Sequence, residues 1–191
     1  MRLNKIIGGV ANFFVDEKIV INKGKILEIL PHRGRMLLLD QVTITDKFVI
    51  GEFKVTETVC EGHEFNGQLI FRGVDIVEMA AQTLGIWLAQ HPESEGKIAY
   101  FRSVSAKFSG MIVPPDVLIV EIPVKGSMSD SDEDSSEESL EEANPRIEIS
   151  GRPGRMLEKA IAENVVARVK GDKKAFIASI ELSIVTLNGS A

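Results

Sequence analysis

The residues best suited to chemistry lie in one stretch, CEGHEFNGQLIFRGVDIVEMAAQ, which spans residues 60–82. His63 sits in its polar, glycine-containing first half, and Glu78 sits in its apolar second half. An imidazole gains and loses a proton near neutral pH, and a carboxylate among apolar residues is costly without a partner. Together the two predict general acid–base chemistry. The ordinary alternative is a surface loop histidine followed by a solvated helix residue.

The element that must position Glu78 is a helix predicted over residues 73–90. Apolar residues recur there at intervals of three and four: Val74, Val77, Ala81, Leu84 and Leu88. A helix that is apolar on most sides is a buried one, and His91-Pro92 ends it. Gln82 lies four residues after Glu78, so both side chains share one face of the helix.

Strand patterns surround this helix, with a short helical turn at 26–30 and a loop at 60–72. The strands are expected at 35–42, 43–58, 98–108, 117–124, 147–150, 160–169 and 174–187. Within 43–58 the predicted packed face is Phe48, Ile50, Phe53 and Val55. The last two strands form a hairpin around residues 170–172. This order favours an α+β fold, in which an antiparallel sheet wraps around one long central helix.

The composition excludes several classes of protein. The chain has 191 residues, which predicts a single globular domain over 1–191. One cysteine, Cys60, excludes a disulfide framework within the chain, and the lack of CxxC pairs or a histidine cluster predicts no metal site. No apolar run approaches the roughly 20 residues of a membrane span, and the first 20 residues show no signal-cleavage pattern. We expect a cytoplasmic protein.

The net charge of −6 comes from one segment, because residues 130–142 hold eight acidic residues and no basic one. This leaves 20 acidic residues against 22 basic ones elsewhere in the chain. Such a segment cannot bury itself, so residues 127–145 are predicted to be an acidic, low-complexity loop insertion. Residues 1–21 are predicted to be a divergent N-terminal extension.

Three segments carry a resemblance to a known family. ILEILPHRGRMLLLDQV (26–42), EGHEFNGQLIFRGVDIVEMAAQ (61–82) and YFRSVSAKFSGMIVPPDVLIVE (100–121) follow one another in the order found in FabZ-type 3-hydroxyacyl-[acyl-carrier-protein] dehydratases. The resemblance runs from about residue 26 to 187, apart from the acidic insertion. It implies the hotdog fold and a lyase that converts (3R)-hydroxyacyl thioesters to trans-2-enoyl thioesters in fatty-acid or related acyl-chain biosynthesis. It implies no metal and no cofactor.

The resemblance also assigns roles. Dehydration needs a base at C2, an acid for the C3 hydroxyl and hydrogen-bond donors for the thioester carbonyl. The family pattern makes His63 the base and Glu78 the acid or the residue that holds the water, with the Gly73 N–H on the carbonyl and Gln82 orienting the carboxylate. It brings His63 and Glu78 together from two subunits of a homodimer or of a trimer of dimers.

The implied macromolecular partner is acyl carrier protein, and no nucleic-acid partner is expected. An acidic carrier would favour a basic rim around the site. The candidates for this rim are Arg33, Arg35, Arg72, Arg102 and Lys107. Scattered surface charge explains these residues equally well.

The sequence departs from the family pattern in the loop after His63. The family's loop prolines are replaced by Phe65, Gln68 and Arg72, and the interval to Glu78 is one residue longer, with Glu64 the simplest extra residue. Fewer prolines predict a less preorganised loop. Asp75 replaces an apolar residue, and it either faces the pocket beside Glu78 or faces solvent.

Three other residues have ordinary interpretations. His32 is predicted to be structural, placing a strand or lining the rim of the site. His91 is predicted to be a helix-end residue, and Cys60 a small packed one. Two other functions remain open: a hotdog thioesterase, and a non-catalytic protein that binds acyl chains or completes an oligomer. The missing prolines favour the latter, and the presence of His63 and Glu78 argues against it.

Overall fold

The computed structural model describes residues 18–94, 97–124, 147–150, 159–172 and 176–188. The predicted acidic insertion at 127–145 therefore lies outside the described residues. The same holds for residues 1–17 of the predicted extension, whose last residues, from Ile19, belong to the first strand.

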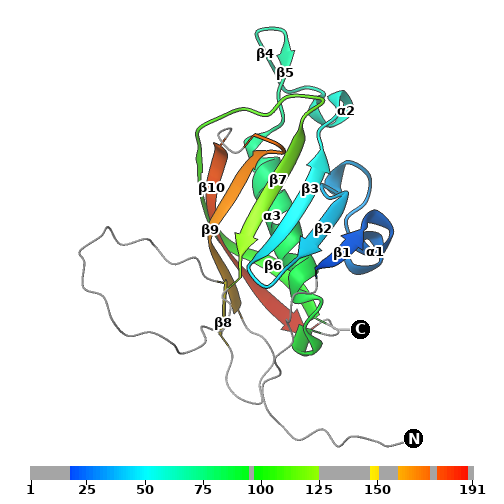
Figure 1. Cartoon of the computed structure of the whole chain (residues 1–191), viewed down its shortest axis with the longest axis vertical. Coiled ribbons are helices and arrows are strands. Elements are labelled where there is room, and N and C mark those ends of the chain that lie inside the picture. Colours follow the sequence, from blue (N-terminus) through cyan, green and yellow to red (C-terminus); the bar gives the residue numbers. More distant parts are fainter. Residues whose placement is uncertain (1–17, 95–96, 125–146, 151–158, 173–175, 189–191) are drawn as a thin grey trace, which may run out of the picture.

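Most of the described strands form one antiparallel sheet (Figure 1). They are β1 Ile19–Asn22, β2 Gln41–Ile44, β3 Phe48–Lys54, β6 Lys97–Phe108, β7 Val117–Pro123, β8 Ile147–Ser150, β9 Lys159–Val169 and β10 Phe176–Asn188. Their order is β1-β2-β3-β7-β9-β10-β6, and β8 pairs with β9. β6 therefore lies at one edge of the sheet and β1 at the other.

The helix α3, Gly73–Leu88, packs against this sheet and supplies much of the core (Figure 1). Its contacts with β3 are close at Gly51, where a Cβ atom would overlap the Thr83 hydroxyl. The helix is buried on most sides, as its apolar pattern predicts, although Val74 is exposed. A curved antiparallel sheet around one long central helix is the hotdog arrangement, so the predicted α+β fold is confirmed.

Most element predictions are confirmed to within one or two residues. These are the long helix, the strands at 98–108, 117–124 and 147–150, and the final hairpin, which is β9 and β10. The predicted turn at 26–30 is a longer helix, α1 Lys23–Ile29, because the Asn22 side chain caps it by accepting from the Lys25 N–H at 3.1 Å. Among the described residues, no helix combines the length and the apolar composition that a membrane span requires.

The predicted strand at 35–42 is wrong over most of its length. A 3-10 helix, η1 Gly34–Met36, comes first, and β2 begins only at Gln41. The leucines between them are buried as expected. They are not in a strand, because the Leu38 N–H donates to the side chain of Gln82 at 3.0 Å.

The predicted segment 43–58 is a strand only in part, since β3 ends at Lys54 and a short helix, α2 Glu57–Cys60, follows. Of its predicted packed face, Phe53 and Val55 are buried, whereas Phe48 is 40% exposed. Alternate residues of a strand point to the same side, so residues 48 and 53 cannot share a face. A second short 3-10 helix, η2 Pro92–Ser94, follows α3.

Candidate active site

A pocket of about 570 Å³ runs along α3 from Glu78 toward the end of the helix. The helix lines it mainly with small or apolar residues, and the segment 28–33 forms part of the wall. Tyr100 and Phe101 of β6 also line it, and both are exposed at this edge of the sheet. A largely apolar groove with the Glu78 carboxylate in its wall suits a substrate with a polar reacting group and an apolar tail.

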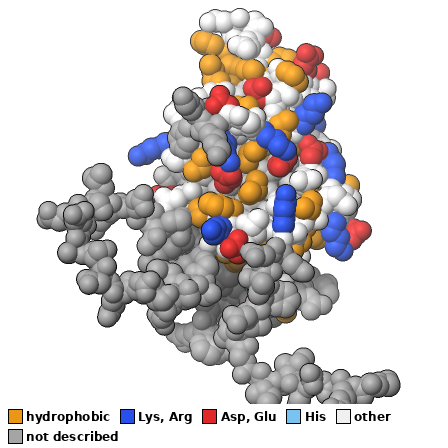
Figure 2. Space-filling model, in the orientation of Figure 1, with side chains coloured by type: hydrophobic (Ala, Val, Ile, Leu, Met, Phe, Trp, Pro, Cys, Tyr) orange, Lys and Arg blue, Asp and Glu red, His pale blue; other side chains and the backbone are white. Residues whose placement is uncertain are grey.

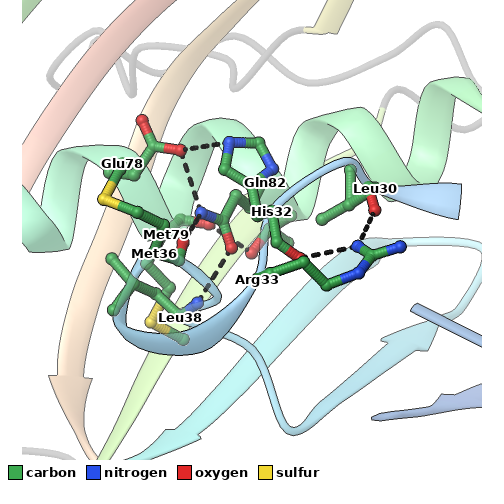
Figure 3. A network of polar contacts seen from close by, with 9 residues as sticks. Leu30, His32, Arg33, Met36, Leu38, Glu78, Met79 and Gln82 are labelled. Carbon is green, nitrogen blue, oxygen red and sulfur yellow. Dashed lines mark hydrogen bonds and ion pairs between the residues drawn. The ribbon is translucent and has the colours of Figure 1, made fainter. Parts of the chain in front are cut away.

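Two side-chain nitrogens lie close to the same oxygen of the Glu78 carboxylate (Figure 3). Gln82 Nε2 donates to Oε1 at 2.9 Å, and His32 Nε2 lies 3.1 Å from the same atom. Among the described residues, Oε2 has no hydrogen-bond partner. One oxygen of the carboxylate is therefore fixed, while the other remains available to a molecule in the pocket.

Gln82 is almost fully buried, at 2% exposure, and it joins the helix to the preceding segment. Its Nε2 also donates to the Met36 carbonyl at 2.7 Å, and its Oε1 accepts from the Leu38 N–H at 3.0 Å (Figure 3). The sequence places Gln82 beside Glu78, and the hydrogen bond between them is present. The two backbone contacts are not indicated by any sequence pattern.

His63 lies at the base of a small exposed hairpin. Its N–H donates to the Cys60 carbonyl at 2.9 Å, and its ring Nδ1 lies 2.8 Å from the Ile70 carbonyl. A carbonyl only accepts hydrogen bonds, so Nδ1 carries the proton of the neutral ring. Nε2 is then left with its lone pair, which is the form that a general base requires.

The hairpin contains β4 Glu64–Phe65 and β5 Gln68–Leu69 and projects from the end of the molecule near α2 (Figure 1). Asn66 and Gly67 connect the strands with φ values of 51° and 78°. An Asn-Gly pair with positive φ at both residues is typical of a tight hairpin turn. The prediction of loop throughout 60–72 is thus wrong here, although the Asn-Gly signal was present in the sequence. The hairpin supplies local order that the missing prolines do not.

The structure of the single chain does not bring His63 and Glu78 together. His63 is exposed and bonded to the base of its hairpin, whereas the described partners of Glu78 are Gln82 and His32. The meeting of His63 with Glu78 across two subunits stays a prediction.

Gly73 begins α3, and its N–H has no acceptor in a preceding helical turn. A Cβ at this position would lie 3.1 Å from the ring of Phe108 on β6. Close packing against Phe108 therefore provides a structural reason for glycine here, independent of its predicted contact with substrate.

Asp75 follows neither of the two predicted alternatives. It is 9% exposed, and its Oδ2 pairs with the Nε of Arg72 at 2.7 Å. Cys60 is buried nearby, and burial raises the pKa of its thiol. The Asp75 carboxylate raises this pKa further, and Arg72 partly offsets the increase. A buried thiol that holds its proton fits the interpretation of Cys60 as a packed residue.

His32 is the functional candidate that the sequence interpretation missed. It does line the pocket, as one of the alternatives stated, but its ring also contacts the Glu78 carboxylate. No motif spacing connects residues so far apart in the sequence. His91 behaves as predicted, because its ring bonds to the Trp87 carbonyl at 3.0 Å and packs on the Trp87 ring at the end of α3.

Three of the five predicted rim residues are engaged within the chain. Arg33 donates to backbone carbonyls, Arg35 lies 3.7 Å from Glu61, and Arg72 pairs with Asp75. Figure 2 shows basic and acidic side chains interspersed on the face it displays. On that face the charges are mixed in sign. Within the described ranges, no three His, Cys, Asp or Glu side chains are grouped as metal ligands would be.

The antiparallel sheet and the single central helix define a hotdog-fold protein, and a carboxylate of this helix lines its pocket. The sequence matches the FabA-like domain over residues 30–133, more than half of the chain. The chain belongs to the FabA-like family.

Curated relatives and one solved structure agree with this assignment. The chain is 43% identical over 103 residues to the 3-hydroxyacyl-[acyl-carrier-protein] dehydratase FabZ of Enterococcus faecalis. This match covers 51% of this chain and 72% of that protein. It is 40% identical over 106 residues to FabZ of Ligilactobacillus salivarius, and this match covers 53% of this chain and 75% of that protein. The structure of the fluoroacetyl-CoA thioesterase FlK matches with a TM-score of 0.51 at 13% identity, over 74% of this chain and 85% of that one. At that identity, the likeness shows the fold alone.

Proposed function

We propose that this protein is a 3-hydroxyacyl-[acyl-carrier-protein] dehydratase, a hydro-lyase of fatty-acid or related acyl-chain biosynthesis. The observation that carries the proposal is the Glu78 carboxylate, held through one oxygen at the end of an apolar pocket. The substrate class comes from the FabZ relatives, which are named for this reaction.

The reaction divides between two side chains. Nε2 of His63 removes the C2 proton, and the electrons of that bond form the C2–C3 double bond as the C3–O bond breaks. Protonated Glu78 gives its proton to the departing hydroxyl, which leaves as water. The Gly73 N–H at the start of α3 stabilises negative charge on the thioester carbonyl. Each turnover leaves His63 protonated and Glu78 ionised, so both must exchange protons before the next one.

A second copy of the chain supplies His63 to each Glu78 in this proposal. β6 is an edge strand of 12 residues, and an unpaired edge of that length invites pairing. Its apolar side chains are exposed in the single chain: Tyr100, Phe101, Val104 and Phe108. We infer a homodimer that covers this edge, and a trimer of such dimers is the larger assembly expected. The carrier protein would deliver its thioester to the same edge, where the pocket lies. The cytoplasmic location stays a prediction.

The alternatives receive less support. The thioesterase likeness concerns the fold alone. The missing prolines favoured a non-catalytic protein, but the Asn66-Gly67 hairpin gives His63 a defined place and a base-competent tautomer. The hairpin and the His63 ring favour catalysis over a non-catalytic role, and the FabZ relatives favour the dehydratase over the thioesterase.

Hydration of a trans-2-enoyl thioester, followed by loss of its ultraviolet absorbance, tests the proposal. His63→Ala and Glu78→Gln should each lower the rate by about 10²- to 10⁴-fold, because each removes a general acid or base. His91→Ala is the matched control and should keep the wild-type rate. Thiol release is measured in parallel. Thiol release without hydration would make the protein a thioesterase, and inactivity of the wild type on carrier-bound substrate would contradict catalysis.

A further inference from the structure

His32 faces the Glu78 carboxylate from the same chain, and the proposed reaction gives it no role. Its Nε2 lies 3.1 Å from Oε1 of Glu78, and both side chains are mostly buried, at 28% and 24% exposure. Gln82 donates to this same oxygen from the next turn of α3 (Figure 3). Two side-chain nitrogens thus converge on one carboxyl oxygen, and the other oxygen has no partner among the described residues.

The backbone fixes the position of His32 independently of Glu78. The guanidinium of Arg33 donates to the carbonyls of Leu27, Leu30 and His32 itself at 2.6–2.7 Å. The bond to the Leu27 carbonyl ties the segment to the last turn of α1, and Figure 3 shows Arg33 beside Leu30 and His32. These bonds therefore fix the backbone from which the His32 ring reaches Glu78.

The surroundings of the second ring nitrogen of His32 bear on which nitrogen carries the ring proton. Nδ1 is buried and has no hydrogen-bond partner among the described residues. A protonated ring would bury an unpaired N–H at this atom, whereas a neutral ring leaves only a lone pair. Because Nδ1 has no acceptor, the ring proton is better placed on Nε2, which faces Glu78 Oε1 at 3.1 Å.

We propose that His32 is a positioning residue that, with Gln82, assigns the transferable proton of Glu78 to Oε2. An oxygen that accepts two N–H bonds acts as the carbonyl-like oxygen of the protonated carboxyl. The acidic proton must then sit on Oε2, the oxygen left for the substrate. A neutral donor does this without adding a cation that would keep Glu78 ionised. This inference rests on the proposed dehydratase function.

Two substitutions separate this role from packing. His32→Gln keeps an N–H donor at about the reach of Nε2, whereas His32→Asn is polar but too short to reach Glu78. The Asn variant should lose about 10- to 100-fold in kcat for enoyl hydration, because a small misplacement of a catalytic group has such effects. Its KM should change by less than about two-fold, since ground-state binding is intact. The Gln variant should regain most of the wild-type kcat.

The matched control is His91→Asn, a histidine just after the C-terminal end of α3, and thermal unfolding is measured for every variant. Equal kcat in the wild type and His32→Asn would overturn the inference alone. So would equal losses in the Asn and Gln variants, or an effect confined to KM, because lining of the pocket would explain either. An inactive wild type would overturn the proposed function together with it. If both variants unfold, nitrogen-15 spectra of wild-type histidines decide: a neutral His32 protonated at Nε2 supports the inference, and any other form overturns it.

Discussion

At the scale of residues, the two oxygens of one carboxyl group differ. Glu78 Oε1 accepts a hydrogen bond from Gln82 of α3 and lies 3.1 Å from His32 Nε2, whereas Oε2 has no partner in the described part of the chain. A general acid in a dehydratase must aim its proton at one atom of the substrate. The asymmetry around Glu78 provides such an aim before the substrate binds.

Gln82 should matter to stability as well as to activity. Gln82→Leu leaves the Leu38 N–H and the Met36 carbonyl unpaired beside the core, so we expect the free energy of unfolding to fall by about 2–4 kcal/mol. Urea denaturation measures this. Gln90→Leu is the control, because Gln90 is exposed and its side chain bonds only to the Ile86 carbonyl among the described residues. Equal losses of unfolding free energy in the two variants would show that the buried hydrogen bonds of Gln82 do not stabilise the fold more than the exposed bond of Gln90.

At the scale of elements, the apolar periodicity of the sequence predicted the helices and strands that bury one face. The long helix and the later strands follow directly from their apolar repeats. The strand predicted at 35–42 failed, because the amide of Leu38 bonds to a side chain far away in the sequence. The contact of His32 with Glu78 could not be predicted from the sequence for the same reason, because the two residues are far apart in it. The hairpin after His63 could have been predicted from Asn66-Gly67 alone.

The closeness of α3 to the sheet depends on Gly51 of β3. Gly51→Ala would push a methyl group into Thr83, and we expect a loss of about 1–3 kcal/mol in the free energy of unfolding. Gly85→Ala is the matched control within α3, where the new Cβ would lie 3.5 Å from Leu30, an ordinary contact. This control should be neutral or stabilise the helix slightly. Denaturation curves that rank the two variants in the opposite order would contradict the packing described.

At the scale of the whole molecule, the two edges of the sheet differ in length and character. β1 is a strand of four residues, whereas β6 has 12 and exposes aromatic side chains beside the pocket. The single chain therefore leaves its site open along β6. We infer that assembly of two copies completes the site and covers this edge.

Matched substitutions on the two edges test this inference. Val104 of β6 and Val20 of β1 are exposed to similar extents, 48% and 51%. Val104→Lys should reduce the particle from the dimer or larger assembly to the 21.0 kDa single chain and abolish hydration, because a buried unpaired charge opposes association. Val20→Lys should leave mass and rate unchanged. Sedimentation velocity gives the masses, and an intact assembly in Val104→Lys would place the interface elsewhere.

The most direct test of the central claim mixes two inactive proteins. His63→Ala and Glu78→Gln are unfolded together, refolded as mixed dimers and assayed for hydration of a trans-2-enoyl thioester. If each site combines His63 of one copy with Glu78 of the other, a mixed dimer regains one intact site, and random mixing restores about a quarter of the wild-type activity. Wild-type protein taken through the same unfolding and refolding is the control. If it regains activity while the mixtures stay as inactive as the two variants alone, the shared site is contradicted.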